Sequence, residues 1–212
     1  MKFGSRGIFK RWHLYHEEMV KAVKKKKFKI SKELRDWIII LIVIGVLRFT
    51  GWHVPVISLF QRALVATNLV QPNRVEEEIN ASFNLVLEDS ENNRIPLSEF
   101  KGQVIFMNFW ATWCPPCLAE MPGIHQLYLE LKDEVVFVMI SKDRDFEKAK
   151  KWIRSKEYEF PVYFIRSPIP QVYQSDVIPA TYVISRDEKV KVQNFGLASY
   201  DTEKFKSFLR SL

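Results

Sequence analysis

The stretch Phe106-Met-Asn-Phe-Trp-Ala-Thr-Trp-Cys-Pro-Pro-Cys117 decides the fold of this 212-residue chain and holds its only two cysteines, Cys114 and Cys117. Residues 104–110 form a nearly unbroken apolar run, which is typical of a strand buried on both faces of a sheet. The two prolines suit the first turn of a helix, where a missing N–H costs nothing. Apolar residues then recur at helical spacing. The stretch therefore predicts a buried strand, a Cys-Pro-Pro-Cys turn and a helix.

The spacing of the two thiols indicates redox chemistry. A disulfide between them closes a very short loop and constrains little chain, so it would be a poor structural cross-link. Amide N–H groups at the helix start favour a thiolate at Cys114, whereas Cys117, one turn inside, is expected to stay protonated and to attack the mixed disulfide. A zinc site would need two more soft ligands, and none of the four histidines lies at ligand spacing near the pair. We therefore expect a redox-active dithiol, no metal and no bound cofactor.

Together with Glu120-Met121-Pro122, this stretch resembles the active-site motif of the thioredoxin superfamily, and most closely that of the TlpA-like membrane-anchored thiol:disulfide reductases. The resemblance extends over residues 81–212 and implies an α/β thioredoxin-like fold, with a central mixed sheet flanked by helices. It also matches Ile178-Pro179 to the family's cis-proline loop. Its implied role is to place Pro179 against the cysteine pair while the backbone of Ile178 hydrogen-bonds an extended substrate.

Five residues around the cysteines belong to the expected site or its surroundings. The resemblance implies that Glu120 assists the inner thiol, because residues three apart share a helix face; the alternative is a solvated surface glutamate. Asn108 stands where thioredoxins carry a buried aspartate, and it cannot titrate. Trp113 adjoins the outer cysteine, and its indole is expected to be either an exposed docking surface or part of the core. Pro115 and Pro116, between the cysteines, are assigned to substrate binding.

The net charge of +7 arises at the N-terminus. Residues 1–35 carry twelve Lys or Arg against three Glu, or +9, so residues 36–212 sum to −2. This basic block precedes the apolar run Trp37–Leu47, a pattern typical of a membrane anchor whose N-terminus is cytoplasmic. As a helix, residues 37–57 would span about 31 Å, close to the thickness of the hydrocarbon core, with Arg48 as their charged residue. Nucleic-acid binding explains the lysines less well, because they adjoin an apolar segment and anionic lipid accounts for them.

The sequence predicts four segments: a basic cytoplasmic segment (1–36), a single-pass transmembrane helix in the inner membrane (37–57), a juxtamembrane linker (58–78) and the thioredoxin-like domain (79–212). A cleaved leader is disfavoured because the charged region is long and no A-x-A pattern follows. This topology places the cysteines in the periplasm or another extracytoplasmic compartment, where disulfides form readily. The expected partners are disulfide-bearing exported proteins, a membrane electron-donor protein and the lipid bilayer, but no nucleic acid. The resemblance suggests apocytochrome c among the substrates.

These features predict a thiol:disulfide oxidoreductase that reduces disulfides of exported proteins. Its direction stays open, since the residues between the cysteines tune the reduction potential. Two alternatives remain. A peroxiredoxin-like peroxidase shares the fold, but its motif places a threonine three residues before the reactive cysteine, whereas Thr112 lies two before Cys114. A non-enzymatic domain could instead use the groove at Pro179 to hold extended peptides.

The rest of the pattern predicts alternating strands and helices followed by an antiparallel pair. Strands are expected at residues 83–87, 135–140, 161–165, 181–184 and 189–195, and a helix at 144–155. Asp201 is expected to cap a closing helix. Residues 59–70 are compatible with an amphipathic helix along the outer interface of the membrane.

Overall fold

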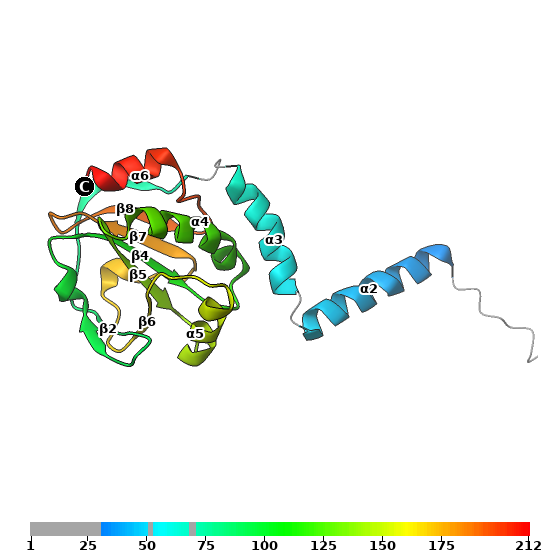
Figure 1. Cartoon of the computed structure of the whole chain (residues 1–212). Helices are drawn as coiled ribbons and strands as arrows, with labels where there is room; N and C mark the ends of the chain where they lie inside the picture. The colour runs from blue at the N-terminus through cyan, green and yellow to red at the C-terminus, as the bar shows by residue number, and fades with distance from the viewer. Residues whose placement is uncertain (1–30, 51–52, 68–70) are drawn as a thin grey trace, which may run out of the picture. The chain divides into compact units, whose positions relative to one another are not determined.

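The computed structural model describes residues 31–50, 53–67 and 71–212 (Figure 1). The chain divides into two compact units, residues 1–50 and 51–212. In the first unit the described element is helix α2 (Lys32–Thr50), whose aliphatic side chains are exposed around the helix. Within the described ranges, no helix combines the length and the apolar content that crossing a membrane requires.

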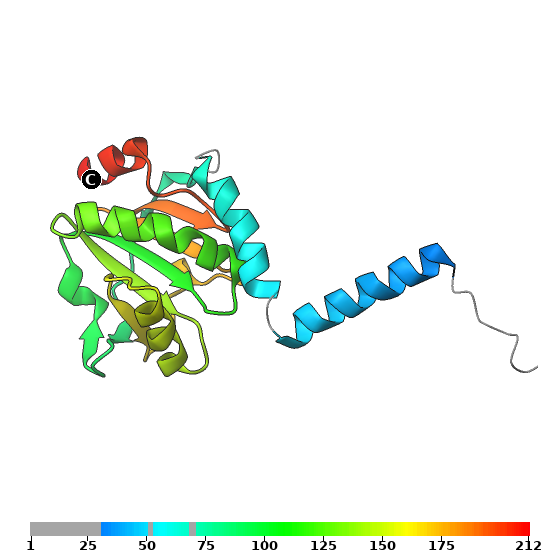
Figure 2. The ribbon, with the colours of Figure 1, turned by 45° about the vertical axis from the view of Figure 1, so that its right-hand side comes forward.

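A mixed sheet of eight strands organises the second unit (Figure 2). The strands are β1 (Arg74–Asn80), β2 (Val86–Glu88), β3 (Arg94–Pro96), β4 (Val104–Trp110), β5 (Val135–Ser141), β6 (Val162–Ile165), β7 (Ala180–Ile184) and β8 (Lys189–Phe195). Their order across the sheet is β1-β8-β7-β4-β5-β6-β2-β3. The β4–β5 and β5–β6 pairs are parallel and the other pairs are antiparallel. The predicted closing hairpin is therefore present as β7 and β8.

The helices of this unit are α3 (His53–Ala66), α4 (Pro115–Leu131), α5 (Phe146–Ser155) and α6 (Glu203–Arg210), with short 3-10 helices η1 (Leu97–Phe100) and η2 (Gln171–Tyr173). Helices α4, α5 and α6 contribute to one buried apolar cluster with the sheet. A second cluster, on the opposite face, contains residues from 85–97 and 169–178. Both faces of the central strands are thus covered.

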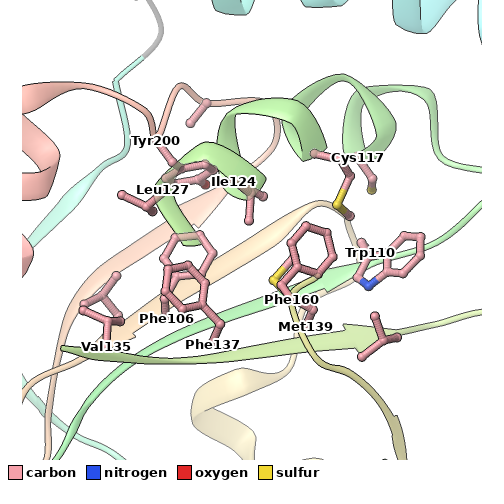
Figure 3. Close-up of a cluster of buried hydrophobic side chains, with 14 of the residues drawn as sticks. Phe106, Trp110, Cys117, Ile124, Leu127, Val135, Phe137, Met139, Phe160 and Tyr200 are labelled. Atoms are coloured by element: carbon pink, nitrogen blue, oxygen red, sulfur yellow. The ribbon is translucent and has the colours of Figure 1, made fainter. Parts of the chain in front are cut away.

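Strand β4 is buried at every position, which explains its unbroken apolar run. Phe106 and Trp110 belong to the cluster under α4, whereas Ile105, Met107 and Phe109 belong to the cluster on the other face. In Figure 3, side chains of α4 point down toward the aromatic rings of the sheet. Burial of each such large apolar side chain contributes about 1.5–3 kcal/mol, so the sheet provides a rigid base for the turn that follows it.

Helix α4 begins where the prolines predict. Cys114 is its N-cap, with an extended backbone (φ −101°, ψ 99°), and Pro115 is the first helical residue. The helix continues through Pro122 and ends at Leu131. Its buried apolar residues recur at helical spacing and include Leu118, Met121, Ile124, Leu127 and Leu131. The predicted strand, turn and helix are confirmed.

The strand expected at residues 83–87 is displaced to 86–88, where β2 pairs with β3 and β6. Before it, the backbone takes other partners. The Ser82 N–H donates to the Tyr173 hydroxyl over 3.1 Å, and the Leu97 N–H donates to the Leu85 carbonyl. Hydrophobic alternation marked the right segment, but these partners decide where the ladder begins.

The predicted cap of the closing helix was wrong by one residue. Thr202 is the N-cap of α6, and its hydroxyl accepts a hydrogen bond from the Phe205 N–H over 3.2 Å. Asp201 instead lies 2.8 Å from the Lys206 ammonium. Threonine and aspartate both favour the N-cap position, but here the Asp201 carboxylate pairs with the buried Lys206 ammonium, and Thr202 caps the helix.

The segment expected as a linker, residues 58–78, differs from that description. Its first half belongs to α3, and its last residues belong to β1, which pairs with the edge of β8. The guanidinium of Arg74 lies 4.1 Å from the centre of the Phe208 ring and ties this strand to α6. Pairing with β1 satisfies backbone groups that an edge strand would otherwise leave open. The expected span at 37–57 covers parts of α2 and α3, with residues 51–52 outside the described ranges.

Candidate redox-active site

The two cysteines form a disulfide at the N-terminus of α4, with their Cα atoms 5.3 Å apart. Cys114 retains 4% exposure, whereas Cys117 has none. A nucleophile or a thiolate from a partner can therefore meet the outer sulfur and not the inner one. This asymmetry matches the division of labour expected from the spacing.

The start of α4 is built to hold negative charge on the outer sulfur. The Cys114 sulfur accepts a hydrogen bond from the Cys117 backbone N–H over 3.3 Å. Lowering the pKa of a thiol from about 8.5 to about 7 requires roughly 2 kcal/mol. The helix dipole supplies about 0.3–1 kcal/mol, and a hydrogen bond to a charged acceptor about 1.5–3 kcal/mol. Together these two effects suffice to favour the Cys114 thiolate once the disulfide is reduced.

The loop before β7 lies against the outer cysteine. The peptide bond between Ile178 and Pro179 is cis, as in the loop that the resemblance implies. The Cys114 sulfur lies 3.6 Å from the carbonyl oxygen of Ile178. The Pro179 carbonyl accepts the Gly196 N–H over 2.8 Å, which holds this loop to the end of β8. The structure therefore brings Ile178 and the cysteine pair together.

Apolar residues adjoin Cys114 and Ile178 in the chain. Trp113 is 56% exposed, so its indole is available at the surface, while Trp110 is fully buried in the core. Pro115 and Pro116 are half-buried. Val177, which the sequence did not single out, is also exposed on the adjoining loop. These residues form an apolar rim at the disulfide, suited to an extended apolar segment of a partner.

Glu120 is buried and is not the solvated glutamate that was the alternative. Its side chain is 1% exposed, and its Oε1 atom accepts the Ala198 N–H over 2.7 Å. Burial raises the pKa of Glu120 well above its usual value, while the amides of Ala198 and Asn108 oppose that rise. Among the described residues, Oε2 has no hydrogen-bond partner. The protonated acid is therefore favoured one helical turn from Cys117, and the hydrogen bond that the structure shows leads to Ala198.

Asn108 belongs to a buried polar chain beneath the site. Its Nδ2 atom donates to the Thr181 hydroxyl over 2.8 Å. The Tyr200 hydroxyl donates to the same oxygen over 2.7 Å. Burial raises the pKa of Tyr200 well above its usual value, and the Glu120 charge raises it further. These groups stay neutral and give the carboxyl of Glu120 a buried, polar surrounding.

Asp143 is a site residue that the sequence reasoning missed. Its Oδ2 atom accepts the Thr112 N–H over 2.9 Å, and its Oδ1 atom accepts the Thr112 hydroxyl over 2.7 Å. Ser141 donates to the same carboxylate over 3.0 Å. Asp143 thus fixes the loop two residues before Cys114 and acts as a positioning residue. The available signal was a short acidic side chain just after β5, whose carboxyl end meets that of the parallel strand β4.

The described residues 31–50, 53–67 and 71–212 contain no group of three or more His, Cys, Asp or Glu side chains that could hold a metal ion.

Known proteins match this chain over the same region. Residues 79–193 match the model of the AhpC/TSA family. Thiol-disulfide oxidoreductase ResA of Bacillus thuringiensis subsp. konkukian is 34% identical over 109 residues, which cover 50% of this chain and 63% of that protein. ResA of Halalkalibacterium halodurans is 31% identical over 132 residues, which cover 61% of this chain and 75% of that protein. The chain thus matches less than two thirds of the length of the first of these relatives.

A solved structure shares the fold. It is a proposed thiol:disulfide interchange protein DsbE from Chlorobium tepidum, 26% identical, with a TM-score of 0.53. The similarity covers 62% of this chain and 95% of that one. The thioredoxin-like fold and the resemblance to thiol:disulfide oxidoreductases, both expected from the sequence, are confirmed.

Proposed function

We propose that this chain, which belongs to the AhpC/TSA family, is a thiol:disulfide oxidoreductase that reduces disulfides of exported proteins through Cys114 and Cys117. The observation that carries the proposal is the disulfide at the start of α4, in which Cys114 retains 4% exposure and Cys117 is fully buried. The relatives named thiol-disulfide oxidoreductase support the same class of reaction.

The reaction begins with the reduced pair. The Cys114 thiolate attacks one sulfur of a substrate disulfide, and the other substrate sulfur leaves as a thiolate and takes up a proton. Cys117 then loses its proton and attacks the Cys114 sulfur of the mixed disulfide. The second substrate thiol is released, and the Cys114–Cys117 disulfide is left. Two electrons have passed to the substrate, and a dithiol donor restores the pair.

Glu120 exchanges a proton with the Cys117 thiol. Cys117 is fully buried, so bulk water does not reach its sulfur directly. Glu120 is buried one turn further along the same face of α4, and burial raises its pKa. A carboxyl group whose pKa is raised holds a proton more readily than an ordinary glutamate does, which suits general acid–base work at Cys117.

The substrate binds as an extended segment beside the outer cysteine. The backbone of Ile178, whose carbonyl lies 3.6 Å from the Cys114 sulfur, offers hydrogen bonds to that segment. Trp113, Pro115 and Pro116 supply the apolar contacts, and the buried Pro179, whose carbonyl accepts the Gly196 N–H, positions the loop that carries Ile178. Backbone pairing gives affinity without demanding one sequence, which suits a reductase with several exported substrates.

The N-terminal region anchors the domain to the inner membrane. Residues 1–36 lie in the cytoplasm, residues 37–57 form a single-pass anchor and the cysteines lie in the periplasm or another extracytoplasmic compartment. The basic block before the apolar run supports this orientation. In α2 the exposed side chains from Trp37 to Ile44 are apolar on every side of the helix, as lipid contact requires. A membrane electron-donor protein reduces the pair, and exported disulfide-bearing proteins, apocytochrome c among them, are its substrates.

Trapping tests the reaction. In cells that express the full chain with Cys117→Ser, mixed disulfides should accumulate on Cys114 and be identified by mass spectrometry after non-reducing isolation. The matched control, Cys114→Ser, leaves the buried thiol and should trap nothing. Equal trapping by both variants, or none by either, would overturn the proposal.

Two further assays separate the alternatives. A peroxidase would oxidise thiols with hydrogen peroxide faster than it reduces protein disulfides. In this structure the Thr112 hydroxyl donates a hydrogen bond to Asp143. A peptide-binding domain would keep full biological activity in Cys114→Ser. The proposed reductase should consume little hydrogen peroxide, and its Cys114→Ser variant should lose biological activity.

A further inference from the structure

Helix α3 differs from an ordinary surface helix in which of its side chains are exposed and which are buried. Ser58 is 4% exposed, whereas its neighbour Leu59 is 68% exposed. Among the α3 side chains whose burial the structure describes, Ser58, Gln61, Arg62 and Val65 are buried or half-buried, and Ile57, Leu59, Ala63 and Leu64 are exposed. A soluble amphipathic helix buries its apolar stripe and exposes its polar one. In α3 that polarity is largely reversed.

Polar contacts hold α3 in this orientation. The Arg62 guanidinium donates to the carbonyl oxygen of Leu118, one residue after the inner cysteine, over 3.4 Å. The Ser199 hydroxyl donates to the Val65 carbonyl over 2.6 Å. A cavity of about 530 Å³, lined in part by Arg62 and Val65 of α3 and by Gly123 of α4, lies between these two helices. The exposed apolar residues Ile57, Leu59, Ala63 and Leu64 are therefore left outside the core of the domain.

The chain itself indicates what covers the exposed side. Only residues 51 and 52 separate the end of α2 at Thr50 from the start of α3 at His53. Helix α3 therefore follows the apolar helix almost directly in the sequence. The exposed residues Ile57, Leu59, Ala63 and Leu64 carry no charge. An uncharged apolar stripe next to a membrane anchor suits the boundary between lipid headgroups and acyl chains.

We propose that the exposed apolar side of α3 lies in the outer interface of the bilayer and seats the redox domain on the membrane. The proposal rests on the N-terminal anchor, and it shortens the predicted span of residues 37–57, because residues 53–57 belong to α3. Through Arg62 and Leu118, α3 then holds the active-site end of α4 at a set height above the lipid. Its partner is the lipid surface, and the outer cysteine is kept where a membrane electron donor can reach it.

Spin labels on the full chain test this placement. The chain carries Cys114→Ser and Cys117→Ser, is reconstituted in nanodiscs of phosphatidylcholine and phosphatidylglycerol, and receives one label at Leu64→Cys. Collisions with oxygen, which concentrates in lipid, are compared with collisions with a water-soluble nickel chelate. The matched control is Leu129→Cys, an exposed leucine on α4 of the same domain, and Leu41→Cys reports on the anchor. Thermal unfolding of each variant checks that it is folded.

The ratio of oxygen to nickel collisions should be several-fold higher at Leu64 and Leu41 than at Leu129. Ala63→Cys, a smaller change on the same side of α3, should repeat the result if Leu64→Cys perturbs folding. A lipid signal at Leu41 with a Leu129-like value on α3 would overturn the proposal and leave the anchor standing. An aqueous signal at Leu41 would instead remove the anchor. A label on α3 shielded from both probes would indicate a protein partner or a second copy and would also overturn the proposal.

Discussion

Asp143 offers the sharpest test of how the fold prepares the outer cysteine. Thr112 gives its carboxylate two hydrogen bonds, over 2.9 and 2.7 Å, and Ser141 gives a third over 3.0 Å. Hydrogen bonds to a charged group contribute about 1.5–3 kcal/mol each, but water can replace part of this at the half-buried Thr112. We expect Asp143→Ala to lower the free energy of unfolding by about 2–3 kcal/mol. The melting temperature should fall by about 5–10 °C.

The same substitution should also change the chemistry of Cys114. Thr112 lies two residues before it, so a loosened loop weakens the contact between the sulfur and the Cys117 N–H. A rise of half to one unit in the pKa of the thiol would slow alkylation of the reduced protein at pH 7 by about three- to tenfold. Stopped-flow alkylation across pH, with calorimetry on the same samples, measures both effects.

Asp145→Ala is the matched control, because Asp145 caps α5 and its Oδ1 atom accepts the Glu147 N–H over 3.0 Å. Losing that cap should cost about 1 kcal/mol and leave Cys114 unchanged. If Asp143→Ala and Asp145→Ala gave the same alkylation profile for Cys114, the positioning role of Asp143 would be refuted. A purely structural role predicts that outcome.

Three further results are expected. Burial raises the pKa of Glu120 above 4.5, so the native state binds a proton that the unfolded chain releases; the wild type should lose stability relative to Glu120→Gln as the pH rises from about 4.5 toward the folded-state value. Urea unfolding at pH 4 and pH 8 measures this, and a difference that does not vary with pH contradicts it. Trp113→Ala should raise KM for protein disulfides several-fold and leave the rate with a small disulfide unchanged; equal losses with both substrates would remove Trp113 from docking. Thr202→Ala should lower the free energy of unfolding by about 1 kcal/mol, whereas an effect below 0.3 kcal/mol would mean that Thr202 is not the operative cap.

Local pattern was enough for the centre of the fold. The apolar run of β4, the prolines and the helical spacing after Cys117 are consecutive in the sequence, and each agrees with the others. The hairpin of β7 and β8 was also predictable, since an apolar run and an alternating run flank a short polar turn. The exposure of Trp113 and the burial of Trp110 follow from their places beside and within the strand.

Features that depend on distant partners were not predictable in this way. Asp143 and Thr112 are 31 residues apart, and only the parallel pairing of β4 and β5 brings them together. Glu120 meets the Ala198 amide 78 residues away, and nothing local shows that this carboxyl is buried. The acidic sequence of β1 is typical of a linker, and its strand conformation depends on pairing with β8. In α3, helical spacing is visible, but which side faces the domain is set by Leu118 and Ser199.

The reactivity of the two reduced thiols tests the central claim most directly. The full chain is reduced, alkylated with iodoacetamide for short times between pH 5 and pH 9, and analysed by peptide mass spectrometry. Cys114 should react first, with an apparent pKa below the usual value of about 8.5, and Cys117 should stay protected while the protein is folded. Equal rates at both thiols, or an unshifted profile at Cys114, would contradict the account.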